Sequence, residues 1–466
     1  MNTYDQVSYS HLPTTETHPD RMAVLARLRG LNPPPVDRAR LLDLGANEGG
    51  CLIPTALSLP HAEFVGIDLA AGPVERGNRI IRDLGLANAR LVQMDLLDMD
   101  ASFGASLGQF DYVIAHGLYA WTPPAVRDKA LAIASENLSA NGIALVSYNT
   151  YPGGYVRKLL REMMLFHAEG ATDPADRIRQ ARAMLSLMAR ANADASGIAT
   201  AVAQEAERTL QRRDASLFHD YMAEGYEPVY FRDFVAHAAR HGLAYVDDAS
   251  VTDTWNVPLP SQTQEEVRQI AAGSPVLREQ YLDLLRLRKF RCSLLCHADA
   301  APRSEWVNTQ AAGLFAASGA RPSGRGEFVL PSGVRMETAH EGVIEFLKRC
   351  RTCWPEAVTV GEREAEMAVA LFQRGFIDLR SVPVAAKRAG EMPLASPLAR
   401  LQARDGPLVS TLLHTAVEIP HADARKFLML LDGTRDRATL ARDSGCSIEQ
   451  VAVELEKASD HGLMMG

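Results

Sequence analysis

Short apolar runs alternate with helix-compatible segments between residues 40 and 150 of the chain. Five of these runs are candidate strands, and they cover residues 41–44, 64–68, 89–95, 110–115 and 143–150. In the intervening segments apolar residues recur at helical spacing, and proline or glycine stands near several of their ends. Strand–helix units that repeat in this way predict a parallel, doubly wound sheet.

The pattern changes after residue 155, where helix-forming residues dominate. We predict five segments: residues 1–155 form a cofactor-binding core with an N-terminal arm, and residues 156–228 an inserted helical cap. Residues 229–300 complete the core and form a regulatory region, with two further strands expected within 231–259 and helix expected across 265–299. Residues 301–385 and 386–466 share a layout of helix, short segment, longer helix, glycine and strand, which predicts two winged-helix-like units.

Composition narrows the class of protein. The chain has 466 residues, is 47% hydrophobic and 23% charged, and carries a net charge of −8. This balance predicts a folded protein with sizeable cores and gives no reason to expect a nucleic-acid partner. No apolar run reaches the ~18 residues of a membrane span, and the N-terminus lacks the features of a signal peptide. We therefore expect a cytoplasmic protein with reduced cysteines and no membrane insertion.

The turn after the first strand, DLGANEGG, has the features of a nucleotide-type site. A dinucleotide fold needs a second glycine where Asn47 stands, and the charge of Asp43 would disfavour a pyrophosphate. A ligand that carries an ammonium and a sulfonium group fits better, which indicates S-adenosylmethionine. Asp68, at the end of the second strand, can accept both ribose hydroxyls. The alternative is an α/β turn that binds nothing.

Other residues at the same edge of the predicted sheet complete the cofactor set. Asp95 follows the third strand and can take the adenine amino group, although it could also be a turn aspartate. The full set of candidate cofactor-binding residues is Asp43, Gly45, Asn47, Asp68, Leu69, Asp95, Leu96, His116 and Tyr4. Tyr4 belongs to a polar and aromatic N-terminal arm that could fold over the cofactor or be a loose arm beside a packing helix.

Aromatic and polar residues follow the fourth and fifth strands. The candidate catalytic residues are Tyr148, Asn149, Tyr151, His116 and Trp121, with Tyr119 beside them. Methyl transfer from a sulfonium is an in-line displacement, so the protein must position and desolvate the nucleophile. Aromatic faces attract a cation and exclude water, and desolvation lowers the pKa of a lysine nucleophile. The aromatic residues could instead pack the cap, and His116 could simply hydrogen-bond a loop.

The cysteines, with His297 beside one pair, are the candidate zinc ligands. Cys292 and Cys296 form one pair and Cys350 and Cys353 another, in segments that we expect to be helical and apolar. The first pair has the wrong spacing for a zinc knuckle, so buried thiols are the better interpretation and we predict no metal site.

Several motifs together resemble a known family. LLDLGANEGG, HGLYAW, YNTYPG and QYLDLLRLRKFRCSLLC are similar to segments of bacterial class I methyltransferases bearing a methyltransferase regulatory domain. That family includes rickettsial protein-lysine methyltransferases of outer membrane protein B. The resemblance implies that Asp43, Gly45, Asp68 and Asp95 line the cofactor site. It also implies that Tyr148, Asn149 and Tyr151 line the methyl-transfer site. The chain departs from the family pattern at Ala46, Asn47 and Gly154.

We therefore predict an α/β fold, a Rossmann-like class I methyltransferase sheet with a helical cap, followed by an α+β C-terminal region with winged-helix-like modules. The expected activity is S-adenosylmethionine-dependent methylation of protein lysines, because a small substrate needs no docking surface as large as the C-terminal half. One alternative is a small-molecule or natural-product methyltransferase whose C-terminal half serves dimerisation. Another is a non-catalytic regulator that binds the cofactor. A homodimer stays open.

Overall fold

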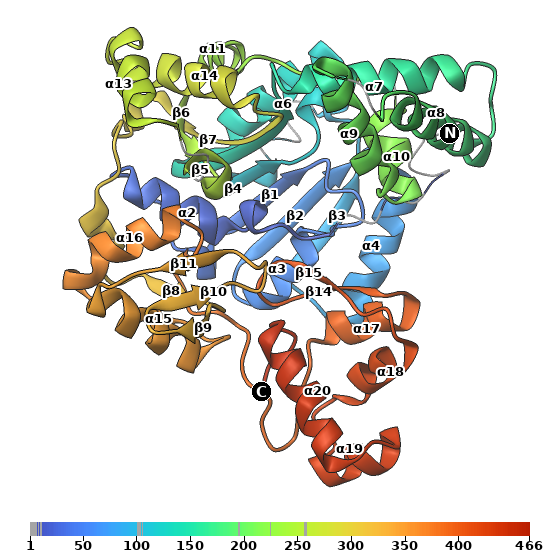
Figure 1. Ribbon diagram of the computed structural model, residues 1–466, viewed down its shortest axis with the longest axis vertical. Helices are drawn as coiled ribbons and strands as arrows, with labels where there is room; N and C mark the ends of the chain where they lie inside the picture. Colours follow the sequence, from blue (N-terminus) through green and yellow to red (C-terminus); the bar gives the residue numbers. More distant parts are fainter. Residues whose placement is uncertain are drawn as a thin grey trace.

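A seven-stranded sheet forms the centre of the computed structural model (Figure 1), which describes residues 7, 9, 12–99, 104, 106–193, 196–223, 225–255 and 259–466. Its strands are β1 (Arg40–Leu44), β2 (Glu63–Asp68), β3 (Ala89–Gln93), β4 (Phe110–Ala115), β5 (Leu138–Asn149), β6 (Leu243–Asp248) and β7 (Phe290–His297). Their spatial order is β3-β2-β1-β4-β5-β7-β6. The first five strands are parallel, and β7 runs antiparallel to both β5 and β6. The predicted Rossmann-like sheet is confirmed.

The seventh strand corrects two predictions. Residues 265–299 were expected to be helical, but they contain β7 after the helices α13 (Ser261–Ile270) and α14 (Pro275–Arg286). The second additional strand expected within 231–259 is absent from the described part of that segment, which holds only β6. The reason is that β7 is buried over six consecutive residues on both faces. A continuous apolar run of that length cannot be told from a buried helix by periodicity.

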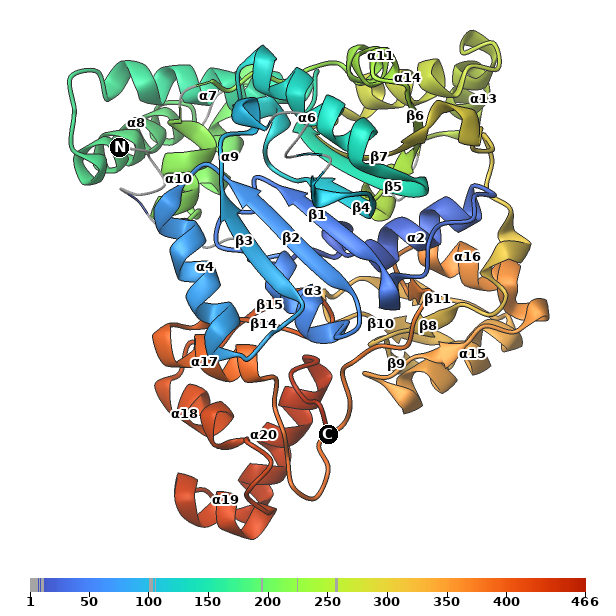
Figure 2. The same cartoon turned by 180° about the vertical axis from the view of Figure 1, so that it is seen from behind.

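Helices cover the sheet on both sides (Figures 1 and 2). The strand connections are α3 (Leu52–Ser58), α4 (Ala71–Asp83) and α6 (Pro124–Asn137), each long enough to cross back over one face. The N-terminal helix α2 (Pro19–Leu28) differs from them because eight of its residues are buried. Its helix cap is His18, whose Nδ1 accepts the backbone N–H of Asp20 at 3.1 Å. A helix buried on nearly all sides must pack between two bodies of the protein.

Those two bodies are the sheet and the C-terminal half, and ion pairs fix α2 to both. Arg29 at the end of the helix lies 2.6 Å from Asp247 of β6. Arg21 lies 2.6 Å from Asp378 in β13 (Asp378–Arg380), and Asp20 accepts the backbone N–H of Ser381 at 2.6 Å. The N-terminal helix therefore joins the two halves of the molecule.

The cap predicted for residues 156–228 is a cluster of four helices beside the carboxyl ends of the strands (Figure 1). They are α7 (Gly154–His167), α8 (Pro174–Ala191), α9 (Ile198–Leu210) and α10 (Asp214–Tyr221). The cap has its own apolar core, which includes Leu160, Met164, Leu185 and Phe218. Gly154 begins α7 where a Cβ atom would lie 3.0 Å from Pro228, so a larger side chain would not fit there without a shift.

The remaining helices complete the core and the C-terminal half. α11 (Phe231–Arg240) and α12 (Val251–Trp255) flank β6. The next region has the short strands β8 (Phe315–Ala317), β9 (Arg321–Gly324), β10 (Glu327–Val329), β11 (Arg335–Glu337) and β12 (Val358–Thr359), with the helices α15 (Glu341–Cys353) and α16 (Ala365–Gln373). Among the described residues, no helix is long and apolar enough to cross a membrane.

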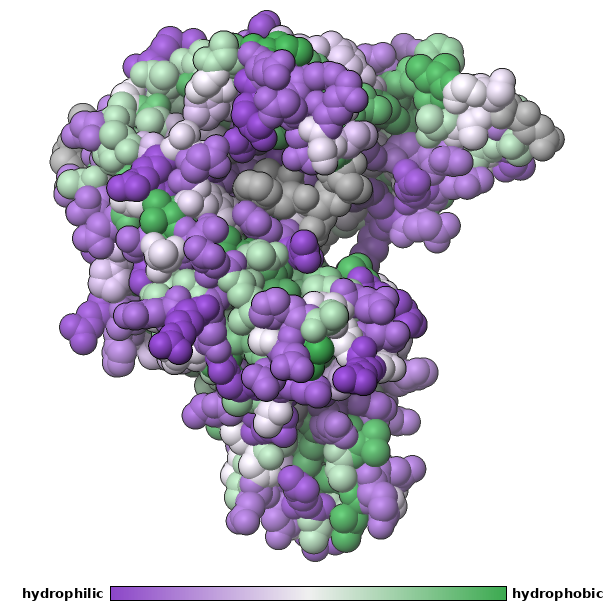
Figure 3. Space-filling model, turned by 60° about the vertical axis from the view of Figure 1, so that its left-hand side comes forward, coloured by the Kyte–Doolittle hydropathy of each residue, from purple (hydrophilic) through white to green (hydrophobic). Residues whose placement is uncertain are grey.

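The terminal unit forms a lobe that projects from the rest of the molecule (Figure 3). It comprises α17 (Pro397–Asp405), the hairpin of β14 (Leu408–Ser410) and β15 (Ala416–Glu418), and the helices α18 (Ala422–Leu430), α19 (Arg437–Ser444) and α20 (Ile448–Asp460). Its separate apolar core contains Phe427, Leu440, Val451 and Leu455. In both C-terminal units a hairpin stands directly before a helix, β10–β11 before α15 and β14–β15 before α18. The boundaries at 300, 385 and the other predicted positions stay predictions.

Candidate active site

A cavity of about 640 Å³ lies at the carboxyl ends of β1, β2, β4 and β5. Its volume lies within the range of small-molecule and cofactor sites. Most of the predicted cofactor residues line it, namely Gly45, Asn47, Asp68, Leu69, Asp95, Leu96 and His116. Trp121 and Asn149 of the predicted catalytic set line it too. Residues far apart in the sequence therefore meet at one edge of the sheet, as parallel strands require.

The turn after β1 is held against the end of β2 by Asp68. One carboxylate oxygen, Oδ2, accepts the backbone N–H of Asn47 at 2.7 Å, and Oδ1 accepts the backbone N–H of Ala70 at 2.8 Å. Gly45 has a φ of 79°, and a Cβ atom at that position would lie 2.9 Å from the Leu118 side chain. The glycine therefore lets the backbone turn where a side chain would clash.

Asn47 stands where a dinucleotide fold has glycine, and its backbone conformation explains the exchange. Its φ is 51°, in the left-handed region that asparagine tolerates better than other side chains. Its Oδ1 accepts the backbone N–H of Glu48 at 2.7 Å, which stabilises the turn locally. The departure from the family pattern at this position is thus compatible with the same glycine-like turn.

The side of the cavity formed after β2 and β3 is largely apolar. Leu69, Met94, Leu96 and Leu97 line it, and Leu69 is 54% exposed. Asp95 caps the short helix η3 (Leu96–Asp98), because its Oδ1 accepts the backbone N–H of Leu97 at 2.9 Å. Apolar side chains around one carboxylate suit a flat heteroaromatic group with an amino substituent.

The opposite side is formed after β4 and β5. Asn149 is 3% exposed, and its Oδ1 has no hydrogen-bond partner among the described residues. Phe290 of β7 is paired with Asn149 in the sheet and also lines the cavity. The rings of His116 and Phe290 meet edge to face with centroids 6.0 Å apart. An unpaired buried acceptor costs about 1–3 kcal/mol, so Asn149 marks a place where a ligand donor is expected.

Tyr148 does not line this cavity, which alters the role expected for it. It is 1% exposed, its hydroxyl lies 2.9 Å from Ser293 Oγ, and its ring stacks on Phe234 with centroids 4.1 Å apart. Burial raises the pKa of the Tyr148 hydroxyl well above its usual range. Successive residues of a strand point to opposite faces, so Asn149 and Tyr148 cannot both face the cavity. We assign Tyr148 to the packing that positions β5.

Tyr151 lies beyond the end of β5 and is also absent from the lining. Its ring stacks on Tyr155 with centroids 4.1 Å apart and lies 5.3 Å from the ring of Tyr230. Trp121, in the short helix η4 (Tyr119–Trp121), packs against Tyr226 with centroids 4.8 Å apart. The predicted aromatic rim therefore consists of Trp121 at the cavity and a separate cluster around Tyr151.

Residues of the cap and the N-terminal arm cover the cavity, and sequence reasoning missed them. They are Tyr9, Arg157, His219 and Asp220, with Lys289, the residue before β7. Tyr9 Oη donates to Asp220 Oδ1 at 3.3 Å, and His219 Nε2 lies 2.8 Å from the carbonyl of Val7. Burial raises the pKa of the Asp220 carboxyl, an effect that Arg157 and Arg212 oppose. No local motif marks these residues, because the cap folds back onto the sheet.

Two predicted cofactor residues are not placed at the cavity. Asp43 is 4% exposed at the end of β1 and is not among the lining residues. Tyr4 lies outside the residues that the structure describes. Tyr9 of the same arm does line the cavity, so the arm reaches the site through a different tyrosine.

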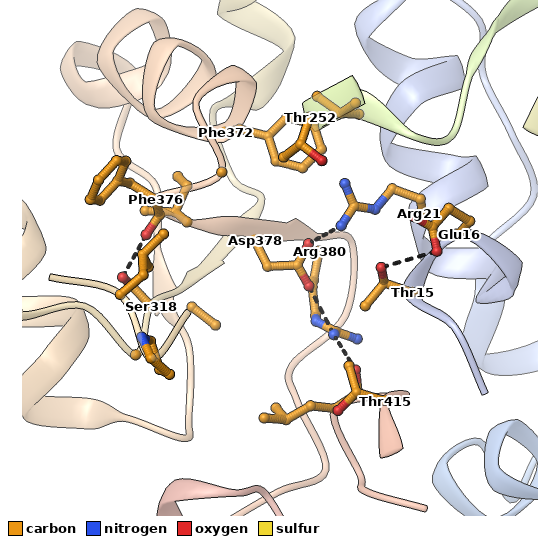
Figure 4. Close-up of a pocket in the computed structure, with 18 of the residues that line it drawn as sticks. Thr15, Glu16, Arg21, Thr252, Ser318, Phe372, Phe376, Asp378, Arg380 and Thr415 are labelled. Atoms are coloured by element: carbon orange, nitrogen blue, oxygen red, sulfur yellow. Dashed lines mark hydrogen bonds and ion pairs between the residues drawn. The ribbon is translucent and has the colours of Figure 1, made fainter. Parts of the chain in front are cut away.

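A second cavity of about 290 Å³ lies between α2 and the C-terminal half (Figure 4). Its two arginines share the carboxylate of Asp378, from which Arg21 lies 2.6 Å and Arg380 2.8 Å, and Arg380 also lies 4.0 Å from Asp20. The charged groups thus serve the joint between the halves rather than a ligand.

The cysteines occupy different elements from those predicted. Cys292 and Cys296 lie in the strand β7 rather than in a helix, whereas Cys350 and Cys353 lie in α15. Burial raises the pKa of the Cys350 thiol to about 12 and that of Cys296 to about 11. In the described part of the chain, no cysteine belongs to a group of side chains that could hold a metal ion.

Three family models match the chain. The one described as "Methyltransferase domain" matches residues 42–144, which hold the first turn and the strands β2 to β4. "Predicted methyltransferase regulatory domain" matches residues 213–297, and "PKMT, C-terminal winged helix domain" matches residues 391–460. The three matches follow one another along the chain in the order expected from its sequence.

Relatives and solved structures resemble both the sequence and the fold. The uncharacterised protein RP789 of Rickettsia prowazekii is 37% identical over 299 residues, which cover 64% of this chain and 53% of that protein. The uncharacterised protein RP028 of the same organism is 33% identical over 238 residues, 51% of this chain and 94% of that protein. The chain thus spans about half the length of RP789. The structure of PKMT2 from Rickettsia typhi in complex with AdoHcy has a TM-score of 0.86 at 25% identity, over 98% of this chain and 100% of that one.

Proposed function

This chain belongs to the S-adenosylmethionine-dependent methyltransferases that carry a methyltransferase regulatory domain, and we propose that it N-methylates lysine side chains of a protein. The observation that carries the proposal is the buried Asn149 Oδ1, an acceptor without a partner among the described residues at the end of β5. A primary amine brings the N–H donor that this atom lacks.

The residues that line the cavity fit the parts of S-adenosylmethionine. The Asp68 carboxylate would accept the ribose hydroxyls, because it lies at the end of β2 in the lining of the cavity and a carboxylate oxygen can accept more than one hydrogen bond. Asp95 would accept from the adenine amino group, with Leu69 and Leu96 against the ring faces. Gly45 would leave room for the methionine part beside the turn.

The bound cofactor supplies a methyl group activated by a positively charged sulfur. The protein's own contribution is to position the acceptor amine in line with that methyl group and to remove its water. Asn149 Oδ1 accepts one N–H of the neutral amine and so directs the nitrogen lone pair. Trp121, Phe290 and His116 exclude water from the same end of the cavity. This surrounding favours the neutral amine, because desolvation penalises the charged form.

A protein acceptor is supported by the C-terminal half. The winged-helix lobe and the α+β region before it together exceed what a small substrate needs. The resemblance to PKMT2 over nearly the whole chain includes that half. A small-molecule acceptor remains the rival enzyme function, and a non-catalytic cofactor-binding regulator is the rival outside enzymes. A homodimer and the lack of a nucleic-acid partner stay predictions.

Methyl transfer from tritium-labelled S-adenosylmethionine into the proteins of a host lysate tests the proposal. We expect labelled protein bands whose acid hydrolysate contains methylated lysine. Asp68→Ala should abolish labelling and weaken binding of S-adenosylhomocysteine in isothermal titration. Asp83→Ala, on the exposed end of α4, is the matched control and should change neither.

The outcomes separate the rivals. No cofactor binding by the unaltered chain would refute both enzyme functions. Binding with label only in small molecules would favour the small-molecule enzyme, and binding with no transfer at all would favour the regulator. Full cofactor affinity in Asp68→Ala would show that the ribose does not lie at Asp68.

A further inference from the structure

A cluster of two histidines and one aspartate lies behind the wall of the cavity. His237 and His241 stand four residues apart on α11 and therefore on one face of that helix. Asp128 comes from α6. Its Oδ1 lies 3.1 Å from His237 Nε2 and 2.9 Å from His241 Nε2. These three side chains are the only group among the described residues whose ligand atoms all lie within 4.8 Å of one another.

The distances from Asp128 Oδ1 to the two histidine nitrogens are close to those that a zinc ion requires, and the two nitrogens lie within 4.8 Å of each other. Zn–N and Zn–O bonds of about 2.0–2.1 Å in a tetrahedral site place neighbouring ligand atoms about 3.3 Å apart. The N···O distances of 2.9 and 3.1 Å need only a small outward movement to reach that separation. Two imidazoles and one carboxylate are also ligands that zinc accepts, with a water molecule as the fourth.

A further contact orients one of the rings. His237 Nδ1 lies 2.7 Å from Tyr119 Oη, so the ring is fixed through the nitrogen that would not bind the ion. Metal-binding histidines usually have such a partner on the second nitrogen, because it sets the tautomer and the ring orientation. The histidine side chains are only 13% and 17% exposed, whereas Asp128 is 59% exposed and leaves an entry path.

We propose that Asp128, His237 and His241 form a Zn²⁺ site that ties α11 to α6. The ion fastens α6, whose Val126 lines the cavity, to α11, which packs behind that wall. Tyr119 belongs to the short helix η4, which also carries Trp121 of the lining. Phe234 of α11 packs on Tyr119 with ring centroids 5.2 Å apart and stacks on Tyr148. The site thus stabilises the wall of the cavity without touching a ligand in it.

Titration of the full chain with Zn²⁺ tests the proposal. The protein is first dialysed against a chelator, and binding is followed by competition with a chromogenic chelator. We expect one equivalent of Zn²⁺ per chain and a rise in Tm. His241→Ala and Asp128→Asn should each abolish both effects, whereas His61→Ala, an exposed histidine outside the cluster, should keep them. Tyr119→Phe should weaken the affinity about 10- to 100-fold, because it removes only the orienting contact.

Cobalt gives a readout that does not depend on the variants folding. Co²⁺ bound to the unaltered chain should show the visible bands of a four-coordinate nitrogen–oxygen site without thiolate charge-transfer absorption. Thiolate absorption would assign the metal to the cysteines and overturn the proposal. The same follows if no stoichiometric binding is found, or if His241→Ala and Asp128→Asn bind Zn²⁺ as well as the unaltered chain does.

Discussion

The two faces of the β5–β7 pair differ in whether their buried polar atoms have hydrogen-bond partners. Asn149 and Phe290 are paired across the strands and line the cavity, whereas their neighbours Tyr148 and Arg291, also paired, face away from it. On the cavity face the buried Asn149 Oδ1 has no partner in the described part of the protein. On the other face, the Tyr148 hydroxyl and the Arg291 guanidinium both have polar partners.

The satisfied face is built around Arg291, which is fully buried. Its guanidinium lies 2.7 Å from Asp283, 3.1 Å from Glu279 and 3.2 Å from Asp248. It also lies over the ring of Phe231, 4.0 Å from the centroid. Surrounded by these carboxylates, Arg291 has a pKa well above its usual range despite the opposing effect of burial.

The comparison teaches how to separate stability from function in a buried polar region. A network whose donors and acceptors are all paired has nothing to offer a ligand, and breaking it leaves buried charge. A buried acceptor left open persists because a bound molecule completes it. The same two strands serve both purposes because their side chains alternate between faces.

The largest effect is expected for Arg291→Met. Removal of the guanidinium leaves buried carboxylates without their cation, which costs about 3–5 kcal/mol of the free energy of unfolding. Urea denaturation measures the loss, and cofactor affinity in the remaining folded protein should persist. Arg268→Met on the exposed surface of α13 is the control and should change stability little. A loss below about 1 kcal/mol would contradict the structural role assigned to this network.

Asn149→Ala should lower activity and leave stability nearly unchanged. We expect kcat to fall about 100-fold, which corresponds to about 2.7 kcal/mol, because the acceptor amine loses its positioning bond. Thermal denaturation should show a Tm close to that of the unaltered chain, since the Oδ1 atom has no partner to lose among the described residues. Asn192→Ala at the end of α8 makes the same chemical change away from the cavity and should leave kcat intact. Unchanged kcat in Asn149→Ala would remove Asn149 from the transfer site.

The pH dependence of the free energy of unfolding tests a buried histidine, His18, that lies outside the cavity. Burial, then His414, Arg380 and Arg21, lower the pKa of His18 well below its usual value. As the pH falls through about 6.5, His18 therefore binds a proton in the unfolded chain but not in the folded chain. Stability is full above that pH, and falls by about 1.4 kcal/mol for each unit below it until the folded pKa is reached.

His18→Asn checks this sign, because it keeps an acceptor for the Asp20 N–H but cannot titrate. Urea unfolding at pH 7.5 and 5.5 should show a smaller loss in the variant than in the unaltered chain. Methyl transfer should decline on acidification in both, because the acceptor amine is protonated. Equal losses of stability in the two proteins would show that His18 is not the group responsible.

The smallest effect is expected for Tyr148→Phe. The change removes one buried hydrogen bond to Ser293, worth about 1 kcal/mol, and keeps the ring that stacks on Phe234. Tyr112→Phe, which removes the buried hydroxyl bonded to the Pro34 carbonyl, is a matched control for stability. Methyl-transfer assays should show kcat retained. A loss of tenfold or more would return Tyr148 to the transfer site, where the family resemblance placed it.

Local patterns predicted the parts of the fold that depend on local chemistry. The first five strands, the glycine turn and the alternation of strand and helix follow from hydrophobic periodicity and turn residues, and the fold class is confirmed. The strand β7 was not predicted, because a run of residues buried on both faces lacks the alternation that marks a strand. The first turn was predicted to hold Asp43 in the site; that side chain is 4% exposed and is not among the lining residues, so its contact with the cofactor stays a prediction.

The sequence by itself determined the sheet, the edge at which the cavity opens and the class of cofactor, because these depend on the order of strands and turns along the chain. The tertiary structure alone decided which face of β5 meets the cavity. It also decided that Tyr9, Arg157 and Asp220 cover the cavity, and that His237 and His241 meet Asp128. The physical reason is that these contacts join segments brought together by packing, and packing depends on the whole buried surface rather than on any local run of residues.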